Sequence, residues 1–162
     1  MSPITEPDEA TPVVRGESRL MEAGIVGDIE FLLARARAVG SVRANQGLAD
    51  VGLKVRSYSV LALACSGLGP SQREMAGFLR LDPSQIVALV DELERRELVA
   101  REPDSRDRRS KVVTGTRAGR TLQTKAARMV RTAEDRSLSP LSETERELLR
   151  DLLRRVAFES PT

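Results

Sequence analysis

The stretch from Ser71 to Arg95 reads S-Q-R-E-M-A-G-F-L-R-L-D-P-S-Q-I-V-A-L-V-D-E-L-E-R and holds two sets of helix-start signals. Ser71 and Glu74 have the spacing of a capping box, in which a hydroxyl and a carboxylate each accept a backbone amide at the start of a helix. Asp82 stands as the next N-cap, with a proline at the first helical position and Gln85 closing a second box. Two short helices about three residues apart predict a helix-turn-helix.

The second of these helices is predicted to have one buried and one open face. Its apolar residues recur at helical spacing and form the buried stripe, which consists of Ile86, Leu89, Val90 and Leu93. At about 100° per residue, the opposite face carries Ser84, Val87, Ala88, Asp91 and Arg95, and Gln85 and Glu92 lie on its flank. Small and amide side chains would let this face approach the base edges of a duplex. Gln85 favours adenine, and Val87 or Ala88 favours the methyl group of thymine.

A charged segment follows, from Arg101 to Lys111, with five basic groups and no apolar side chain to bury. It stands between a helix and the β-prone run 112–114, an order that predicts a hairpin tip beside the helix. Asp91 would repel DNA phosphates unless it is neutralised, and the nearest strong cations in chain order lie in this segment. We expect Asp91 to pair with an arginine there, in the first place Arg109. The alternative for Asp91 is a solvated carboxylate.

The flanking residues predict further helices. Residues 25–39 show a long amphipathic pattern, and residues 58–65 are apolar nearly all round, which is typical of a buried helix. Thr116 can cap the next helix, and Ser142 opens another capping box. The last helix carries a broad stripe of Leu148, Leu149, Leu152, Leu153, Val156 and Phe158. This stripe is wider than one small neighbour needs, so we expect a dimer interface; the alternative is packing within one chain.

Length and charge limit the classes of protein. The 162 residues suit one compact domain, and no stretch approaches the roughly 20 apolar residues that cross a bilayer. With no secretory signal and no internal disulfide, the expected compartment is the cytoplasm, without a membrane partner. Residues 1–34 hold seven acids against two arginines, whereas residues 95–136 hold thirteen bases against six acids. The basic half suits a phosphate backbone, or is a solvated helix face.

Enzymatic chemistry has little support in this composition. The chain has no histidine, which excludes histidine as general base or metal ligand, and one cysteine does not make a structural zinc site. We therefore expect no catalytic residue, no metal and no cofactor. Cys65 stands among apolar residues and is interpreted as core filler. One tyrosine, three phenylalanines and no tryptophan argue against stacking on single-stranded bases.

The run from Ser71 to Gly119 resembles the winged helix-turn-helix core of MarR-type transcriptional regulators. The motifs that carry the resemblance are S-Q-R-E-M-A-G-F-L, D-P-S-Q-I-V-A-L-V-D-E-L-E, L-V, D-S-R-D-R-R and T-R-A-G. The resemblance implies a mainly α fold with a small β-wing, in which N- and C-terminal helices of two subunits interlock. Each subunit then presents a recognition helix and a wing to a palindromic operator in double-stranded DNA.

The resemblance also assigns roles to residues. The expected DNA contacts are Ser71, Gln72, Arg73, Ser84, Gln85, Val87, Ala88, Arg95, Arg106, Arg108, Arg109 and Lys111. The family's wing aspartate falls on Asp107, and its ion pair between the recognition helix and the wing falls on Asp91 and Arg109. The family usually has a small residue, often glycine, at Arg80 and Glu97. Because a left-handed glutamate costs about 1 kcal/mol or more, we expect the turn at Glu97 to differ. Arg80 adds a phosphate contact.

Members of this family often bind a small anionic or phenolic effector between the dimer helices and the DNA-binding lobe. Arg43, Arg56 and Tyr58 are the polar candidates here, although helix-end charge or a partly buried tyrosine explains them equally well. Peroxide sensors of the family carry a cysteine near the start of the first helix, where this chain has none, so Cys65 is not expected to be a sensor.

The expected organisation has four parts. It comprises a flexible arm (1–17), an N-terminal dimerisation helix (18–52), a winged helix-turn-helix lobe (53–115) and C-terminal dimerisation helices (116–162). The favoured function is a sequence-specific DNA-binding regulator, a dimeric repressor. The alternative is a helical architectural or interaction module that binds DNA or an acidic partner without reading sequence.

Overall fold

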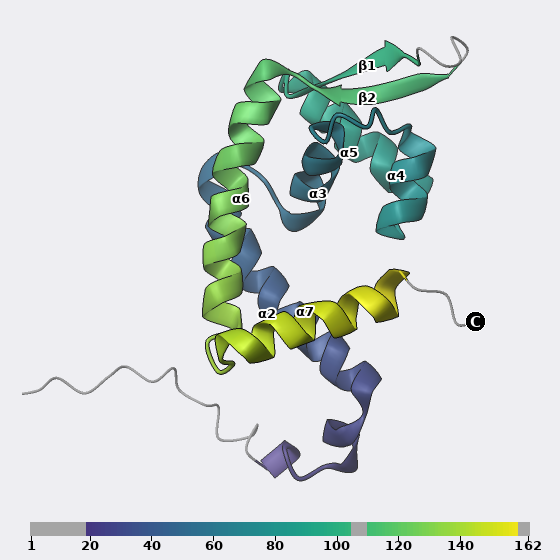
Figure 1. Cartoon of the computed structure of the whole chain (residues 1–162). Helices are drawn as coiled ribbons and strands as arrows, with labels where there is room; N and C mark the ends of the chain where they lie inside the picture. Colours follow the sequence, from purple (N-terminus) through teal and green to yellow (C-terminus); the bar gives the residue numbers. More distant parts are fainter. Residues whose placement is uncertain (1–18, 105–109, 159–162) are drawn as a thin grey trace, which may run out of the picture. The chain divides into compact units, whose positions relative to one another are not determined.

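The computed structural model describes residues 19–104 and 110–158 (Figure 1). Its elements are η1 (Gly24–Gly27), α2 (Ile29–Leu48), η2 (Ala49–Val51), α3 (Val55–Ala64), α4 (Gln72–Leu79), α5 (Pro83–Arg95), β1 (Val99–Pro103), β2 (Lys111–Gly115), α6 (Arg117–Ser137) and α7 (Glu143–Phe158). The chain forms two compact units, and the boundary between them lies after Ala38. The mainly helical fold with a small β-wing is the predicted one. No helix among the described residues is both long and apolar enough to cross a membrane.

The first predicted helix begins later and ends later than the sequence pattern indicates. Residues 24–27 form a short 3-10 helix, and Asp28 is extended, with φ −79° and ψ 125°. The α-helical pattern therefore starts only at Ile29, because the extended residue interrupts it. At the other end α2 continues to Leu48 and is followed directly by η2.

Three predicted helix caps are confirmed. At the start of α4, Ser71 Oγ accepts the amide of Glu74 at 3.2 Å, and Glu74 Oε2 accepts the amide of Ser71 at 2.7 Å. Ser142 and Glu145 repeat this exchange before α7, at 3.4 Å and 2.8 Å. The hydrogen bonds from the backbone and the hydroxyl of Ser142 lower the pKa of Glu145. Thr116 caps α6.

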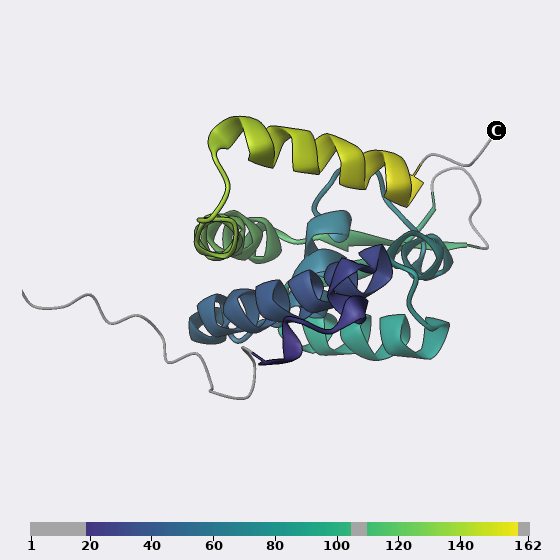
Figure 2. The ribbon, with the colours of Figure 1, turned by 90° about the horizontal axis from the view of Figure 1, so that it is seen from below.

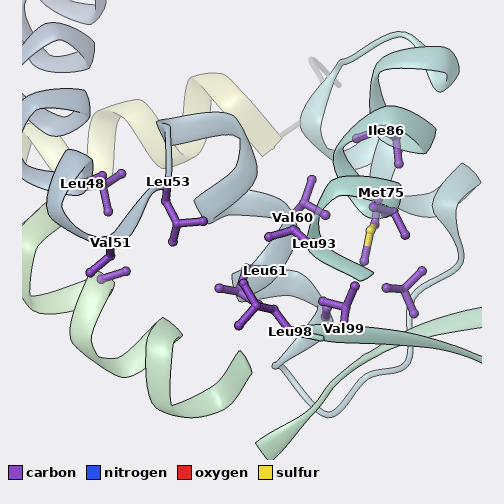
Figure 3. Close-up of a cluster of buried hydrophobic side chains, with 14 of the residues drawn as sticks. Leu48, Val51, Leu53, Val60, Leu61, Met75, Ile86, Leu93, Leu98 and Val99 are labelled. Carbon is purple, nitrogen blue, oxygen red and sulfur yellow. The ribbon is translucent and has the colours of Figure 1, made fainter. Parts of the chain in front are cut away.

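A single apolar core holds the second unit together, with α3 at its centre (Figure 3). This helix contacts α4, α5, α6 and β2. The side chains that are essentially inaccessible to solvent are Leu48, Val60, Leu61, Met75, Ile86, Val90, Leu93 and Val113. Each contributes roughly 1.5–3 kcal/mol through its burial. The buried stripe predicted for α5 is confirmed, with Leu89 packing at its edge.

The wing is an antiparallel pair in which Arg101 of β1 faces Val113 of β2. Val113 is buried, and its amide donates to the carbonyl of Pro70 at 2.9 Å, so the wing is attached to the segment before α4. The sequence pattern indicated a strand only at residues 112–114. Strand β1 was hidden because Arg101 and Glu102 interrupt its apolar alternation.

Three helical segments end in the same way, with a left-handed residue followed by a leucine. The left-handed residues are Gly52, Arg80 and Glu97, with φ of 63°, 52° and 56°. In each case the leucine amide donates five residues back, from Leu53 to Leu48 at 3.2 Å, from Leu81 to Ala76 at 3.1 Å and from Leu98 to Leu93 at 2.9 Å. This geometry is the Schellman motif, which satisfies carbonyls at a helix end and places an apolar side chain against the last turn.

The expectation that the turn at Glu97 differs is wrong. Glu97 keeps the left-handed conformation because its neighbours stabilise it. Leu98 is buried, the amide of Thr116 donates to the carbonyl of Leu98 at 3.0 Å, and the Thr116 hydroxyl donates to the carbonyl of Glu97 at 2.7 Å.

Glycine should relieve the strain at both of the non-glycine helix ends. We expect Arg80→Gly and Glu97→Gly each to raise the free energy of unfolding by roughly 0.5–1 kcal/mol, measured by urea denaturation. Glu97→Ala is the control, because alanine removes the charge and keeps the strain. An alanine variant as stable as the glycine variant would show that charge, not conformation, limits stability there.

The C-terminal helices are joined by a turn that one arginine organises. Arg146 Nε donates to the carbonyls of Leu138 and Leu141, each at 3.1 Å. From this turn α7 leaves the end of α6 at a sharp angle and runs toward the side on which α4 lies (Figures 1 and 2). At its far end Phe158 stacks on Phe78 of α4, with ring centroids 5.6 Å apart.

Candidate nucleic-acid interface

Helix α5 presents an open face of the predicted kind. Ser84, Gln85, Val87, Ala88, Asp91 and Arg95 are all exposed. Val87 stands out because 41% of this valine is accessible although the neighbouring Ile86 and Val90 are fully buried. An apolar side chain in the middle of a polar, exposed helix face is the feature that a thymine methyl group would cover.

The start of α5 differs from the predicted capping box. Asp82 caps the helix, but its carboxylate accepts the amide of Ser84 at 2.7 Å and the Ser84 hydroxyl at 2.5 Å. These bonds, the hydroxyl first, lower the pKa of Asp82. Gln85 does not close the box, because among the described residues no hydrogen bond joins its side chain to the backbone amide of Asp82. The side-chain amide of Gln85 has no partner among these residues, which leaves it available for a base edge.

Arg101 joins the wing to both helices of the helix-turn-helix. Its guanidinium donates to Asp91 Oδ1 at 2.5 Å, to Gln72 Oε1 at 2.8 Å and to Glu94 Oε2. Its backbone amide donates to Glu94 Oε1 at 3.2 Å. Only 18% of the Arg101 side chain is exposed. The three acceptors come from α4 and α5, so this arginine fixes β1 against both helices.

The charges in this cluster favour ionised arginine. Partial burial lowers the pKa of Arg101 and is the largest single influence, but the hydrogen bonds and charges of Asp91 and Glu94 outweigh it and raise the pKa overall. Asp91 therefore meets a cation from the wing. Arg109, its expected partner, lies outside the described residues, so that pairing stays a prediction. The cluster of Arg101, Gln72 and Glu94 was not predicted, because the register that pairs Arg101 with Val113 is not visible in the sequence.

Part of the predicted wing also falls outside the described residues, namely Arg106, Asp107 and Arg108. Lys111, the first residue of β2, is exposed and lies opposite Pro103 in the strand pair. Its ammonium group is placed at the outer part of the wing, where a phosphate contact is expected.

The three predicted contacts at the start of α4 are not equivalent. The Ser71 hydroxyl donates to Glu74 Oε2 at 2.7 Å, and Gln72 Oε1 is occupied by Arg101. Arg73 is exposed and has no partner within the described residues. Of the three, Arg73 is the cation with no partner among the described residues, and the Gln72 NH2 group can still donate.

The three effector candidates have different surroundings. Arg43 donates to the carbonyl of Arg136 at 3.1 Å, as a helix-end cation does, Arg56 is exposed, and Tyr58 packs against the core. The surface has an apolar hollow in the first unit, lined by Phe31 and Leu32 among others, and another beside the start of α6, lined by Leu98 and Leu122 among others. None of the three candidates lines either hollow.

Cys65 packs against the core, as expected for a small apolar side chain. Burial raises the pKa of its thiol, and the charge of Arg120 opposes this effect only partly. A Cβ on Gly115 would overlap the sulfur. The thiol is therefore protonated and confined at neutral pH, which is the opposite of a reactive cysteine.

Together, the open face of α5, the preceding α4 and a wing ordered by Arg101 define a winged helix-turn-helix DNA-binding protein. The comparisons with known proteins name the family. The MarR family model matches residues 55–111. A MarR-family transcriptional regulator from Rhodococcus sp. RHA1 is 41% identical, over 86% of this chain and 100% of its own, with a TM-score of 0.79.

Two structures of proteins named CouR are also similar. CouR from Rhodococcus jostii RHA1, solved with p-coumaroyl-CoA, is 43% identical over 87% of this chain and 99% of its own, with a TM-score of 0.78. The transcriptional repressor CouR on a 23-mer DNA duplex is 31% identical over 83% and 96%, with a TM-score of 0.74. A search of curated proteins finds no match. The chain belongs to the MarR family of DNA-binding transcriptional regulators, which are not enzymes.

Proposed function

We propose that the protein is a dimeric repressor that reads a palindromic operator through α5 and the wing. The observation that carries this proposal is the exposed face of α5. On this face the side chain of Val87 is accessible to solvent, and the side-chain amide of Gln85 has no partner among the described residues. Sequence reading needs such unoccupied side chains at the end of a rigid helix, whereas phosphate binding needs only cations. The similarity to a repressor solved on DNA supports the same function.

The dimer would use the apolar surfaces outside the DNA-binding lobe. On α7, the exposed large apolar side chains are Leu148, Leu152, Leu153, Val156 and Phe158. In the first unit they are Leu20, Met21, Ile25, Ile29 and Leu32. Two subunits joined there would read half-sites about one helical turn, roughly 34 Å, apart. Sedimentation of the protein as a monomer at micromolar concentration would contradict this part of the proposal.

We retain the four-part organisation as part of the proposal, with the arm at 1–17, dimerisation helices at 18–52 and 116–162, and the DNA-binding lobe at 53–115. The site of action is the cytoplasm. The similarity to CouR bound to p-coumaroyl-CoA supports release of DNA by a small anionic or phenolic effector. Arg56 and Tyr58, both on α3, remain its candidate contacts, with Arg43 from α2.

The deciding experiment is selection of bound duplexes from a random pool. We expect a palindrome with one defined half-site spacing. No enrichment would favour the alternative, an architectural or interaction module that binds DNA or an acidic partner without reading sequence.

Matched variants then separate base reading from phosphate binding. Gln85→Ala should lower affinity for the selected duplex about tenfold or more and abolish discrimination at one adenine, because a bidentate amide contact contributes roughly 1–3 kcal/mol. Arg73→Ala should weaken all duplexes by a similar factor. Fluorescence anisotropy on the selected duplex and on single-base variants measures both. Equal losses for every base in the Gln85 variant would contradict base reading.

A further inference from the structure

Arg96 connects the end of α5 to the segment that follows α2. It is the residue after the last turn of α5, and its guanidinium donates through Nη1 to the carbonyl of Gly52 at 2.7 Å and through Nη2 to the carbonyl of Val51 at 2.9 Å. Both carbonyls lie at the end of η2, which continues directly from α2. These groups are 44 and 45 residues away in the sequence.

The geometry of this contact restricts rotation. Two hydrogen bonds from one planar guanidinium to neighbouring carbonyls hold a helix end in one orientation. A lysine ammonium group, which is a compact point charge, would not fix the orientation in this way. The acceptors are helix-end carbonyls, whose partial negative charge favours a cation. One third of the Arg96 side chain is exposed, at 33%, and Glu92 Oε1 lies 4.0 Å from Nη1 on the side of α5. Gly52 is left-handed, which turns its carbonyl toward the arginine.

Buried apolar side chains surround this contact. Leu48 and Leu53 lie in the same buried cluster as Leu93 and Leu98 (Figure 3). Apolar contacts are non-directional and permit small rotations between packed elements, whereas the two Arg96 bonds do not. Among the described residues, Arg96 thus provides two directional bonds between the end of α5 and the segment that follows α2.

We propose that Arg96 is a positioning residue that fixes the orientation of the recognition helix relative to the C-terminal end of α2, and so sets the separation of the two recognition helices in the dimer. The last clause rests on the proposed dimeric repressor. The first clause does not, because it concerns contacts within one chain. Arg96 acts through α5 and does not touch the bases.

The first test needs neither DNA nor a dimer. Spin labels are attached at Gln46→Cys on α2 and Ala88→Cys on α5 in a Cys65→Ser chain, and labelled protein is diluted with unlabelled protein so that only pairs within one chain are measured. We expect Arg96→Met to broaden the distance distribution between the labels at least twofold, and Arg96→Lys to broaden it partly. An unchanged distribution would overturn the proposal.

The second test uses DNA. Affinity is measured for the selected palindrome, for versions with one base pair added or removed between half-sites, and for a single half-site. We expect Arg96→Met to reduce spacing discrimination about tenfold while half-site affinity changes less than twofold. Arg95→Met is the control, because this exposed neighbour should weaken all duplexes equally. A uniform loss in the Arg96 variant would overturn the proposal. A wild-type protein that selects no palindrome would refute the proposed function, and the label distances would still decide the role of Arg96.

Discussion

Replacing Gly119 with alanine should lower the free energy of unfolding by about 3 kcal/mol or more. The first turn of α6 lies so close to Leu98, the residue before β1, that a Cβ on Gly119 would overlap the carbonyl oxygen of Leu98. The overlapped atom is backbone, and it already accepts the amide of Thr116, so neither side moves cheaply. Urea denaturation followed by circular dichroism measures the change.

Gly77 provides a matched control for this substitution. It also lies inside a helix, but its Cβ would meet no atom within 4 Å. Gly77→Ala should therefore raise stability by roughly 0.5–1 kcal/mol, since alanine has the higher helix propensity. Opposite signs for the two variants would establish close approach as the cause, and a loss of similar size in both would contradict it.

Replacing Arg101 with methionine should lower affinity for the selected duplex about 100-fold. The substitution leaves Asp91 and Glu94 without their shared cation on the proposed DNA-binding side, and it removes the hydrogen bonds that join Arg101 of β1 to α4 and α5. A 100-fold loss corresponds to about 2.8 kcal/mol of binding free energy, at about 1.4 kcal/mol for each factor of ten. Fluorescence anisotropy at fixed salt measures it.

Two further variants identify the cause. Arg131→Met removes an equal charge from an exposed position of α6, outside this cluster, and should change affinity less than threefold. Adding Asp91→Asn to Arg101→Met should restore part of the affinity, because the uncompensated carboxylate is removed. If the Arg131 variant loses as much as the Arg101 variant, overall charge and not the cluster governs binding.

Local signals in the sequence predicted much of this fold. The caps at Ser71, Thr116 and Ser142 involve residues within a few positions of each other, so spacing alone reveals them. The open face of α5 follows from helical periodicity in the same way. The second capping box was predicted wrongly: Asp82 Oδ1 accepts the amide and the hydroxyl of Ser84, and Gln85 does not reach back, which depends on side-chain geometry that spacing does not contain.

Contacts between distant segments could not be predicted in this way. Arg101 reaches α5 through the register of two strands, and Arg96 reaches Val51 across 45 residues. In the sequence both are simply members of an arginine-rich stretch. Glu97 was predicted wrongly for the same reason. The cost of its left-handed conformation can be judged from the residue type alone, whereas the burial of Leu98 that stabilises it depends on distant segments.

Several arginines of this chain bind oxygens of the protein itself and are therefore less available to a phosphate backbone. Arg96, Arg101 and Arg120 all belong to the basic stretch, and each donates to carbonyl or carboxylate oxygens of the protein itself. A cation that is already bound in this way displaces few ions from a phosphate backbone when the duplex arrives. Because each phosphate neutralised contributes about 0.9 to the slope of log affinity against log salt, the protein should respond to ionic strength as a less basic molecule than its composition suggests.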